Sequence, residues 1–364
     1  MLALHAGGAG PGRRACGPLD RKGQDRVRPA HLPQAARRLN GALLVDGLTR
    51  RDVLVGAAGA ALLAACRSRG RGTIRVGFMT NLTHGPAIVG LASGRIAGAL
   101  GAPVETRSFR AGPRVLEALL GDAIDVGVAG PSAIVYTNAR HGAGTLRLVS
   151  GCCSGGASFL VTKESGIRGW EDLRGKTLAT TQIGTTQDIS LRQFLRQRGY
   201  VTADHGGDVT VAALDAATIL TEMRRGKLDG AWMAEPWATR LEHDAGAVRL
   251  VDERDLWPGR RFPTALVVAR GDFARAHEPL VAQLRTAIAD EVRRATSAPD
   301  DTRAAVGDEL SRALGKRLPD ALLAAAWPFV DFTSDPLVSA LDVIARDATA
   351  LGLAPPSTHA TLLG

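Results

Sequence analysis

After Thr73 the chain alternates between short apolar runs and longer amphipathic stretches, and this alternation restricts the folds available to it. The expected strands are Ile74–Met79, Val104–Phe109, Ile124–Ala129, Leu146–Gly151, Lys176–Thr180, Val209–Ala213, Gly230–Met233 and Val248–Val251. The expected helices between them are Ala87–Leu100, Pro113–Leu120, Ser132–Arg140, Asp188–Arg198, Ala216–Arg225 and Trp237–Ala245. Strands that alternate with helices predict an α/β fold built on parallel sheets.

Two extended runs do not follow this alternation. Ser158–Thr162 and Thr264–Ala269 bracket the second set of strands, and we interpret them as paired crossings between two lobes. The tail after Gly271 is helical and is expected to return to cover the first lobe. Its expected helices are Phe273–Thr296, Thr302–Leu314, Pro319–Ala326 and Pro336–Leu351. This predicts a first lobe from residues 73–160 and 266–364, and a second lobe from residues 161–265.

Four strand-to-helix turns carry polar or helix-starting residues where a cleft between such lobes would lie. In open α/β sheets, ligands bind at the carboxyl ends of the strands. A helix N-terminus offers unpaired N–H donors and a partial positive charge, so several such ends facing one cleft form an anion site. Each turn alone also fits a plain helix cap, and Thr185 with Asp188 matches a capping box. The turns are Asn81–Pro86, Gly130–Ser132, Gly184–Asp188 and Ala234–Trp237.

Several residues near these turns have two interpretations. Trp232 either walls an apolar ligand tail or packs in the core. Glu235 either pairs with the amine of a zwitterionic ligand or caps its helix. The glycines around Gly155 suggest a hinge or a close approach of the ligand. Cys152 and Cys153 are neighbours, and we interpret them as packed small apolar residues rather than as a redox pair.

Known catalytic and cofactor motifs are missing from the sequence. The eight histidines are scattered, without a His-x-x-x-His pair or a Cys/His metal spacing. The chain has no Gly-x-Ser-x-Gly elbow and no phosphate loop that ends in Gly-Lys-Ser/Thr. The formal net charge is +9, but residues 1–72 hold 13 Lys/Arg and 4 Asp/Glu, so the remaining 292 residues are neutral overall. We therefore expect no cofactor, no metal and no nucleic-acid partner.

The N-terminal region has the pattern of an export signal. Arg50-Arg51 precedes an uncharged run, Val53–Ala65, and Leu63–Cys66 forms a lipobox. The run of 13 residues spans about 20 Å as a helix, which is too short to cross a ~30 Å hydrocarbon core. Paired arginines are typical of the twin-arginine route. The alternatives are a plain signal peptide with an incidental cysteine, or a buried Ala-rich helix.

From this pattern we divide the leader into three parts. Residues 1–45 are expected to be disordered or to result from a misassigned start codon. Residues 46–65 form the signal peptide, and residues 66–72 form a linker. Cys66 is the expected lipid acceptor, so the folded domain would work outside the cytoplasm, tethered to a membrane.

Five segments resemble one known family. They are Val76–Phe78 with Asn81–His84, Ala118–Ala133, Gly169–Arg192, Gly226–Arg240 and Leu256–Pro258. The chain resembles the periplasmic solute-binding lipoproteins of ABC importers for aliphatic sulfonates, taurine and nitrate, over essentially all of Thr73–Gly364. It departs from the family at Thr185, where members commonly have Asn, and at Cys152 and Cys153, where members have small residues. The exact ligand therefore stays open.

The resemblance implies a two-lobed periplasmic-binding-protein fold (type II, Venus flytrap) with two hinge crossings. It implies a monomer that binds a small anionic or zwitterionic ligand between the lobes, delivers it to an ABC permease and does no chemistry on it. The implied ligand-binding residues are Asn81, Ser132, Gly155, Thr185, Thr186, Gln187, Trp232 and Glu235.

Two other functions remain open. One is a binding protein for a thiamine-pyrimidine precursor or another heterocycle, on which the tryptophans would stack. The other is a pyrimidine-synthase-like enzyme of the same superfamily, against which the export signal and the lack of a clear cofactor lysine argue.

Overall fold

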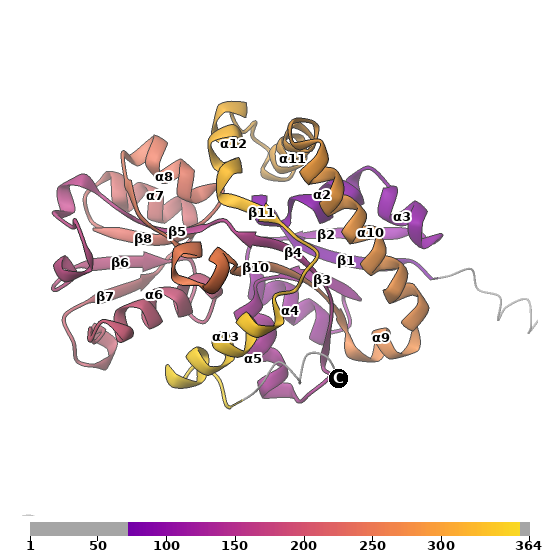
Figure 1. Cartoon of the computed structure of the whole chain (residues 1–364), viewed down its shortest axis with the longest axis horizontal. Coiled ribbons are helices and arrows are strands. Elements are labelled where there is room, and N and C mark those ends of the chain that lie inside the picture. The colour runs from indigo at the N-terminus through magenta and orange to yellow at the C-terminus, as the bar shows by residue number, and fades with distance from the viewer. Residues whose placement is uncertain (1–71, 357–364) are drawn as a thin grey trace, which may run out of the picture. The chain divides into compact units, whose positions relative to one another are not determined.

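The computed structural model describes residues 72–356 (Figure 1). These residues belong to a single compact unit. The leader extension, the signal peptide, Cys66 and all of the linker except Gly72 lie outside the described residues, so those expectations stay predictions.

The first sheet has six strands within the described part of the chain, in the order β11-β4-β10-β3-β1-β2. Its strands are β1 (Ile74–Met79), β2 (Val104–Phe109), β3 (Val126–Ala129), β4 (Leu146–Gly155), β10 (Pro263–Arg270) and β11 (Val330–Phe332). β1, β2 and β3 run parallel, whereas β10, β4 and β11 pair antiparallel with their neighbours.

The second sheet has five strands among residues 72–356, in the order β7-β6-β8-β5-β9. They are β5 (Ala157–Val161), β6 (Thr177–Thr180), β7 (Thr210–Ala213), β8 (Gly230–Ala234) and β9 (Val248–Asp252). β7, β6 and β8 are parallel, and β5 pairs antiparallel with both β8 and β9. The α/β class is therefore confirmed, but the expectation of parallel sheets holds only for the strands that helical crossovers connect.

The helices follow the predicted positions closely, with two expected helices divided. They are α2 (Gly85–Ala92), α3 (Arg95–Leu100), α4 (Gly112–Leu120), α5 (Pro131–His141), α6 (Thr186–Gln197), α7 (Ala216–Arg224), α8 (Trp237–Ala245), α9 (Gly271–Ala276), α10 (Glu278–Ser297), α11 (Pro299–Leu314), α12 (Asp320–Ala326) and α13 (Val338–Ala350). The expected helix Ala87–Leu100 is two helices because Gly94 has a φ of 73°, a left-handed conformation that interrupts the helix. The expected helix from Phe273 is likewise divided at His277, between α9 and α10.

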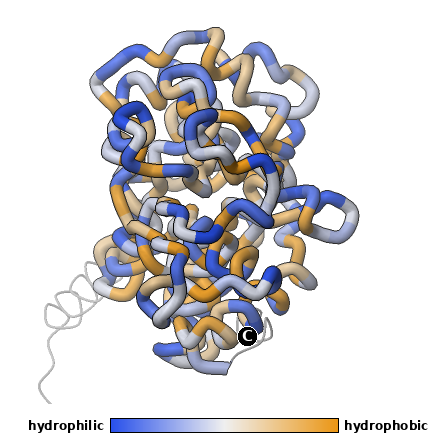
Figure 2. The backbone as a smooth tube through the Cα atoms, turned by 90° about the vertical axis from the view of Figure 1, so that its left-hand side faces the viewer, coloured by the Kyte–Doolittle hydropathy of each residue, from blue (hydrophilic) through white to orange (hydrophobic). Residues whose placement is uncertain are grey.

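Each sheet is covered by helices on both faces, and strand alternation assigns the side chains to them (Figure 1). On β10, Ala265, Val267 and Ala269 pack toward α2, α10 and α11, while Leu266 and Val268 pack toward α4, α5 and α13. On β8 of the second sheet, Ala231 and Met233 face the α7–α8 side, and Trp232 faces α6. Figure 2 shows hydrophobic and hydrophilic segments that follow one another along the whole backbone tube.

The two extended runs belong to different sheets, which corrects the expected paired crossings. Ser158–Thr162 largely coincides with β5 of the second sheet, and Thr264–Ala269 lies within β10 of the first, so each run is a strand of one lobe rather than the crossing itself. The chain crosses between the sheets at Gly155-Gly156 and between β9 and β10. The structure thus places residues 157–160 in the second lobe and 263–265 in the first.

The C-terminal tail covers more than the first lobe. α10 and α11 pack on α2, as expected, but α12 contacts α8 of the second lobe, and α13 contacts α5 and α6. The Gln193 side-chain amide on α6 donates to Asp347 Oδ1 on α13 at 2.8 Å. Within residues 72–356, no helix has the length and apolar character needed to span a membrane.

Candidate functional site

The turn after β3 presents a buried hydroxyl at a helix start. α5 begins at Pro131, and its N-cap residue, Gly130, has no side chain that could cap the helix. Ser132 lies in the first turn of α5 and is 1% exposed. Among the side chains of residues 72–356, its Oγ is the one buried polar atom that has no hydrogen-bond partner. A buried hydroxyl without a partner costs free energy, which a water, an ion or a ligand bound at this position would recover.

The turn after β6 presents a second uncapped helix start. α6 begins at Thr186, and its N-cap residue, Thr185, makes no side-chain cap. The Thr185 hydroxyl instead donates to the Gln182 carbonyl at 2.7 Å. Asp188 Oδ2 accepts from the Gly184 amide at 2.9 Å, which holds the turn in place. The capping box expected between Thr185 and Asp188 is therefore wrong, and the first N–H groups of α6 are left without a side-chain partner.

These two helix starts meet between the lobes. The Ser132 amide donates to Thr186 Oγ1 at 3.4 Å. Contact is so close that a Cβ atom added to Gly130 would lie 2.7 Å from the same Thr186 oxygen. Two hydroxyls and two partly positive helix ends thus converge on one point, which is an arrangement that attracts an anion. Of the residues expected to bind a ligand, the structure thus brings Ser132 and Thr186 together, and the half-buried Gln187 follows Thr186 on α6.

The turn after β1 is organised by its own side chains. Asn81 Oδ1 accepts from the amide and the hydroxyl of Thr83, both at 3.1 Å. His84 is buried, and its Nδ1 accepts from the Met79 amide at 3.3 Å. Burial lowers the pKa of His84 to about 3, so the ring is neutral and structural. Asn81 remains half-buried and caps the short helix Leu82–His84.

Trp232 lies in the core of the second lobe. It is 0% exposed, its ring centroid is 5.6 Å from that of Phe159 and 5.4 Å from that of Phe194, and its Nε1 donates to Glu253 Oε2 at 2.8 Å. The side chain points to this face because even and odd residues of β8 alternate between opposite faces of the sheet. The expectation that Trp232 walls the ligand is therefore wrong, and the core-packing interpretation is confirmed.

Glu235 is held inside the second lobe. Its Oε1 accepts from Arg249 Nη2 at 2.9 Å, and its Oε2 accepts from the Thr239 amide in the first turn of α8 at 3.0 Å. Burial raises the pKa of Glu235, while the charge of Arg249 and the Thr239 hydrogen bonds oppose that rise. The helix-capping interpretation of Glu235 is confirmed. The sequence analysis did not identify Arg249. A charged residue inside an otherwise apolar strand does, however, indicate a buried ion pair of the kind that Arg249 forms with Glu235.

Gly155 forms part of the hinge. Its φ is 69°, its amide donates to the Phe262 carbonyl at 2.8 Å, and its carbonyl accepts from the Thr264 hydroxyl. A Cβ atom on Gly155 would lie 2.6 Å from Cδ of Arg254. These contacts join the two crossings, so they favour the hinge interpretation over close approach of a ligand.

The neighbouring cysteines are packed in the core of the first lobe. Cys152 is 0% exposed and Cys153 is 1% exposed. Burial raises the pKa of the Cys152 thiol to about 12 and also raises that of Cys153, so both stay protonated. Their interpretation as small apolar residues is confirmed.

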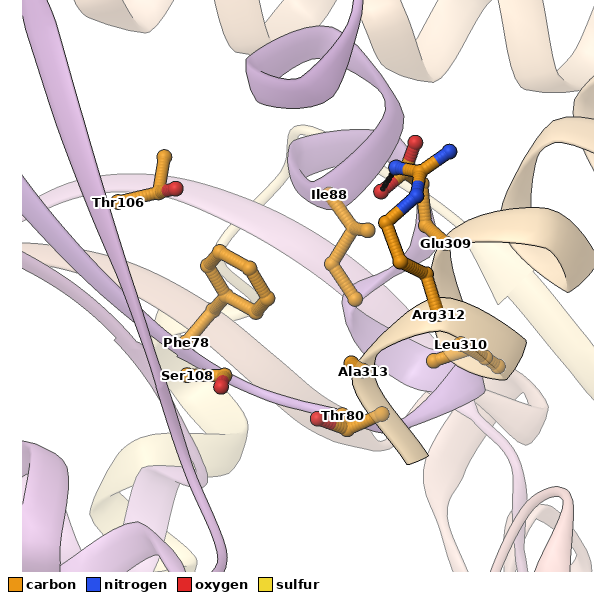
Figure 3. A pocket seen from close by; sticks show the side chains of 9 residues that line it. All are labelled: Phe78, Thr80, Ile88, Thr106, Ser108, Glu309, Leu310, Arg312 and Ala313. Atoms are coloured by element: carbon orange, nitrogen blue, oxygen red, sulfur yellow. Dashed lines mark hydrogen bonds and ion pairs between the residues drawn. The ribbon is translucent and has the colours of Figure 1, made fainter. Parts of the chain in front are cut away.

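A surface pocket lies elsewhere on the first lobe (Figure 3). It has a volume of about 170 Å³ and lies between β1, β2, α2 and α11. Its wall combines the Phe78 ring with an exposed ion pair between Arg312 and Glu309. None of the eight residues expected to bind the ligand lines it. Within the described residues, no group of three or more His, Cys, Asp or Glu side chains could hold a metal ion.

Comparisons with known proteins find relatives of this chain among binding proteins. The model of the NMT1-like family matches residues 69–309. A putative binding protein of Brucella abortus is 27% identical over 231 residues, which cover 63% of this chain and 69% of that protein. The taurine-binding periplasmic protein of Escherichia coli is 29% identical over 216 residues, which cover 59% of this chain and 64% of that protein.

The fold is that of solved binding proteins. The alkanesulfonate-binding protein of Xanthomonas axonopodis pv. citri, solved with bound MOPS, superposes with a TM-score of 0.64 at 22% identity, covering 78% of this chain and 94% of that chain. The expected two-lobed periplasmic-binding-protein fold is thereby confirmed. The relatives named here are binding proteins rather than enzymes. With a family match that extends over well more than half of its length, the chain belongs to the NMT1-like family.

Proposed function

We propose that this chain is the extracytoplasmic substrate-binding lipoprotein of an ABC importer, and that it captures a small sulfonate or related oxyanion between its lobes. The observation that carries the proposal is the buried, unpartnered Ser132 hydroxyl at the start of α5, opposite Thr186 at the start of α6. Its named relatives bind taurine and alkanesulfonate, which supports the same ligand class here.

The donors at this point suit an oxyanion without a metal ion. Two helix N-termini and two hydroxyls can donate to the oxygens of one small anion. A hydrogen bond to a charged group contributes roughly 1.5–3 kcal/mol. We expect a few such bonds to give a dissociation constant of about 1 μM, which corresponds to about −8 kcal/mol.

Closure of the lobes would transmit ligand binding to the permease. Ser132 belongs to the first lobe and Thr186 to the second, so a ligand bound to both favours the state in which the lobes are together. The closed state is the one that we expect the ABC permease to recognise. The protein would act as a monomer and leave the ligand chemically unchanged.

Thr186→Val tests the ligand site. Valine keeps the shape of threonine but removes the hydroxyl, so binding should weaken about 10- to 100-fold, the loss of one hydrogen bond to a charged ligand. The measurement is isothermal titration of the domain Arg67–Gly364 with methanesulfonate, taurine, longer alkanesulfonates, nitrate and hydroxymethylpyrimidine.

Thr221→Val is the matched control, because the Thr221 hydroxyl donates only within its own helix, to the Ala217 carbonyl at 2.9 Å, and the side chain is exposed. The control should bind like the wild type. Unchanged affinity of Thr186→Val for an anion that the wild type binds would place the site elsewhere. If only the pyrimidine binds, the heterocycle alternative replaces the oxyanion, although the burial of Trp232 argues against ring stacking on that side chain.

Attachment to the membrane rests on the leader sequence. Leu63–Cys66 is a lipobox behind Arg50-Arg51, so Cys66 would carry the diacylglyceryl group after export by the twin-arginine route. Cys66→Ala should abolish labelling with a radioactive fatty acid and leave the signal peptide uncleaved at this site. Lysine at both positions 50 and 51 should stop export while keeping the charge. Labelling that persists without Cys66 would contradict lipidation there.

A further inference from the structure

We infer that the interlobe site selects a simple anion and discriminates against ligands that carry an ammonium group, so that it prefers alkanesulfonates to aminoalkanesulfonates. This inference rests on the proposed function and specifies its substrate class. It follows from the carboxylates around the cleft, since a carboxylate is the usual partner of a bound ammonium group.

From the sequence, Glu235 was the carboxylate expected to pair with the ammonium group of such a ligand. It lies at the junction of the lobes, because its amide donates to the Gly156 carbonyl at 2.8 Å and a Cβ atom on Gly156 would lie 3.0 Å from the Thr83 side chain. Its carboxylate nevertheless points into the second lobe. Arg249 occupies Oε1, the Thr239 amide occupies Oε2, and the residue is 0% exposed.

The cation that holds Glu235 is itself firmly placed. Arg249 also pairs with Glu242 Oε2 at 2.7 Å, and its guanidinium carbon lies 3.6 Å from the centroid of the Phe329 ring. Its side chain is 10% exposed. Releasing Glu235 toward a ligand would therefore leave a buried arginine with one carboxylate fewer, which is costly.

The other carboxylates at the strand-to-helix turns of the second lobe are also engaged. Asp188 is 0% exposed and accepts from the Thr180 hydroxyl at 3.1 Å and from Arg192 Nε at 3.0 Å. Asp215 caps α7 and accepts from the amides of Ala217 and Thr218.

In the first lobe, the turns that follow β1, β2 and β3 contain no Asp or Glu at all. These turns are Thr80-Asn81, Arg110-Ala111 and Gly130. Each described turn at the carboxyl end of a parallel strand thus has either no carboxylate or one that already accepts hydrogen bonds within the protein.

An ammonium group entering this site would lose water without gaining a counter-charge. Ammonium is a compact and strongly hydrated ion, so the loss is large. A methyl group at the same position has no strong hydration to lose, and its burial contributes favourable free energy to binding. Taurine and 1-propanesulfonate make this comparison directly, because they differ only in carrying an ammonium or a methyl group at the end of the same two-carbon chain.

The test is isothermal titration of the domain Arg67–Gly364 with these two compounds at one pH and ionic strength. 1-Propanesulfonate should bind at least tenfold more tightly than taurine, which corresponds to about 1.4 kcal/mol. Glu235→Gln should leave this ratio unchanged, because the Glu235 carboxylate faces Arg249 and α8 rather than the ligand. Glu242→Gln is the matched control, since it removes the other carboxylate paired with Arg249, and it should also leave the ratio unchanged.

Equal or tighter binding of taurine would overturn the inference, and so would a selective loss of taurine affinity in Glu235→Gln. Either result would leave the proposed sulfonate site standing, because a sulfonate would still bind. Failure of both compounds to bind, when another class of ligand does, would overturn the proposed function together with the inference.

Discussion

Replacing Glu253 by glutamine should remove a pH dependence of stability that the wild-type fold contains. Glu253 is 1% exposed, its Oε2 accepts from Trp232 Nε1 at 2.8 Å, and its Oε1 is hydrogen-bonded to the Ser190 hydroxyl. Burial raises the pKa of Glu253 to about 8 from an ordinary value of 4.5. The nearest charges do not offset this burial, because Asp252 adds a further rise in the pKa.

The direction of this pH dependence follows from whether the folded or the unfolded chain keeps the proton on Glu253. Below pH 4.5 the carboxyl is protonated in both the folded and the unfolded chain, so it costs the fold nothing. Between pH 4.5 and 8 the unfolded chain releases the proton while the folded chain keeps it, and stability falls with rising pH. Each pH unit in this window removes about 1.4 kcal/mol, which sums to an upper limit of about 5 kcal/mol.

Glutamine keeps both hydrogen bonds and has no proton to lose. Its carbonyl can accept from Trp232, and its amide can donate to the Ser190 oxygen. The difference in unfolding free energy between Glu253→Gln and the wild type should therefore shift in favour of the variant by about 3 kcal/mol from pH 5 to pH 7.

Urea unfolding at pH 5, 6, 7 and 8 measures this shift, and the comparison between variants cancels the other titrating groups. Glu164→Gln is the control, because the Glu164 side chain is exposed, and it should follow the wild-type curve. A difference between Glu253→Gln and the wild type that stays constant from pH 5 to pH 8 would refute the reasoning.

Two further substitutions test the core and the contact between the lobes. Trp232→Ala should destabilise the fold by about 3–5 kcal/mol in urea unfolding, because it empties a fully buried position between Phe159 and Phe194; a loss below 1 kcal/mol would argue against core packing. Gly130→Ala places a Cβ atom 2.7 Å from Thr186 Oγ1, so ligand affinity in titration should fall at least tenfold, or about 1.4 kcal/mol, while stability in the absence of ligand changes little. Unchanged affinity would show that the lobes do not meet there when the ligand is bound.

Local pattern in the sequence determined the elements of this fold. Ile74–Met79, Val104–Phe109 and Trp237–Ala245 form the strands and the helix that were expected, because strand and helix periodicity depends on neighbouring residues alone. The uncapped helix starts at Ser132 and Thr186 were also visible as polar turns after strands. A turn of this kind is encoded within a few residues.

Only the tertiary structure decided how these elements face one another. β5 runs antiparallel to β8, and β10 runs antiparallel to β3. These directions depend on pairing between strands that are distant in the sequence. The alternation of side chains along β8 places Trp232 on the opposite face of the sheet from Ala231 and Met233. It does not determine which of the two faces packs against α6. The partner of Glu235 is Arg249, 14 residues away on another strand, and such a pair exists only once both strands are packed. The contact between Ser132 and Thr186, 54 residues apart, likewise requires both lobes in place, and for this physical reason the site became definable only in the folded chain.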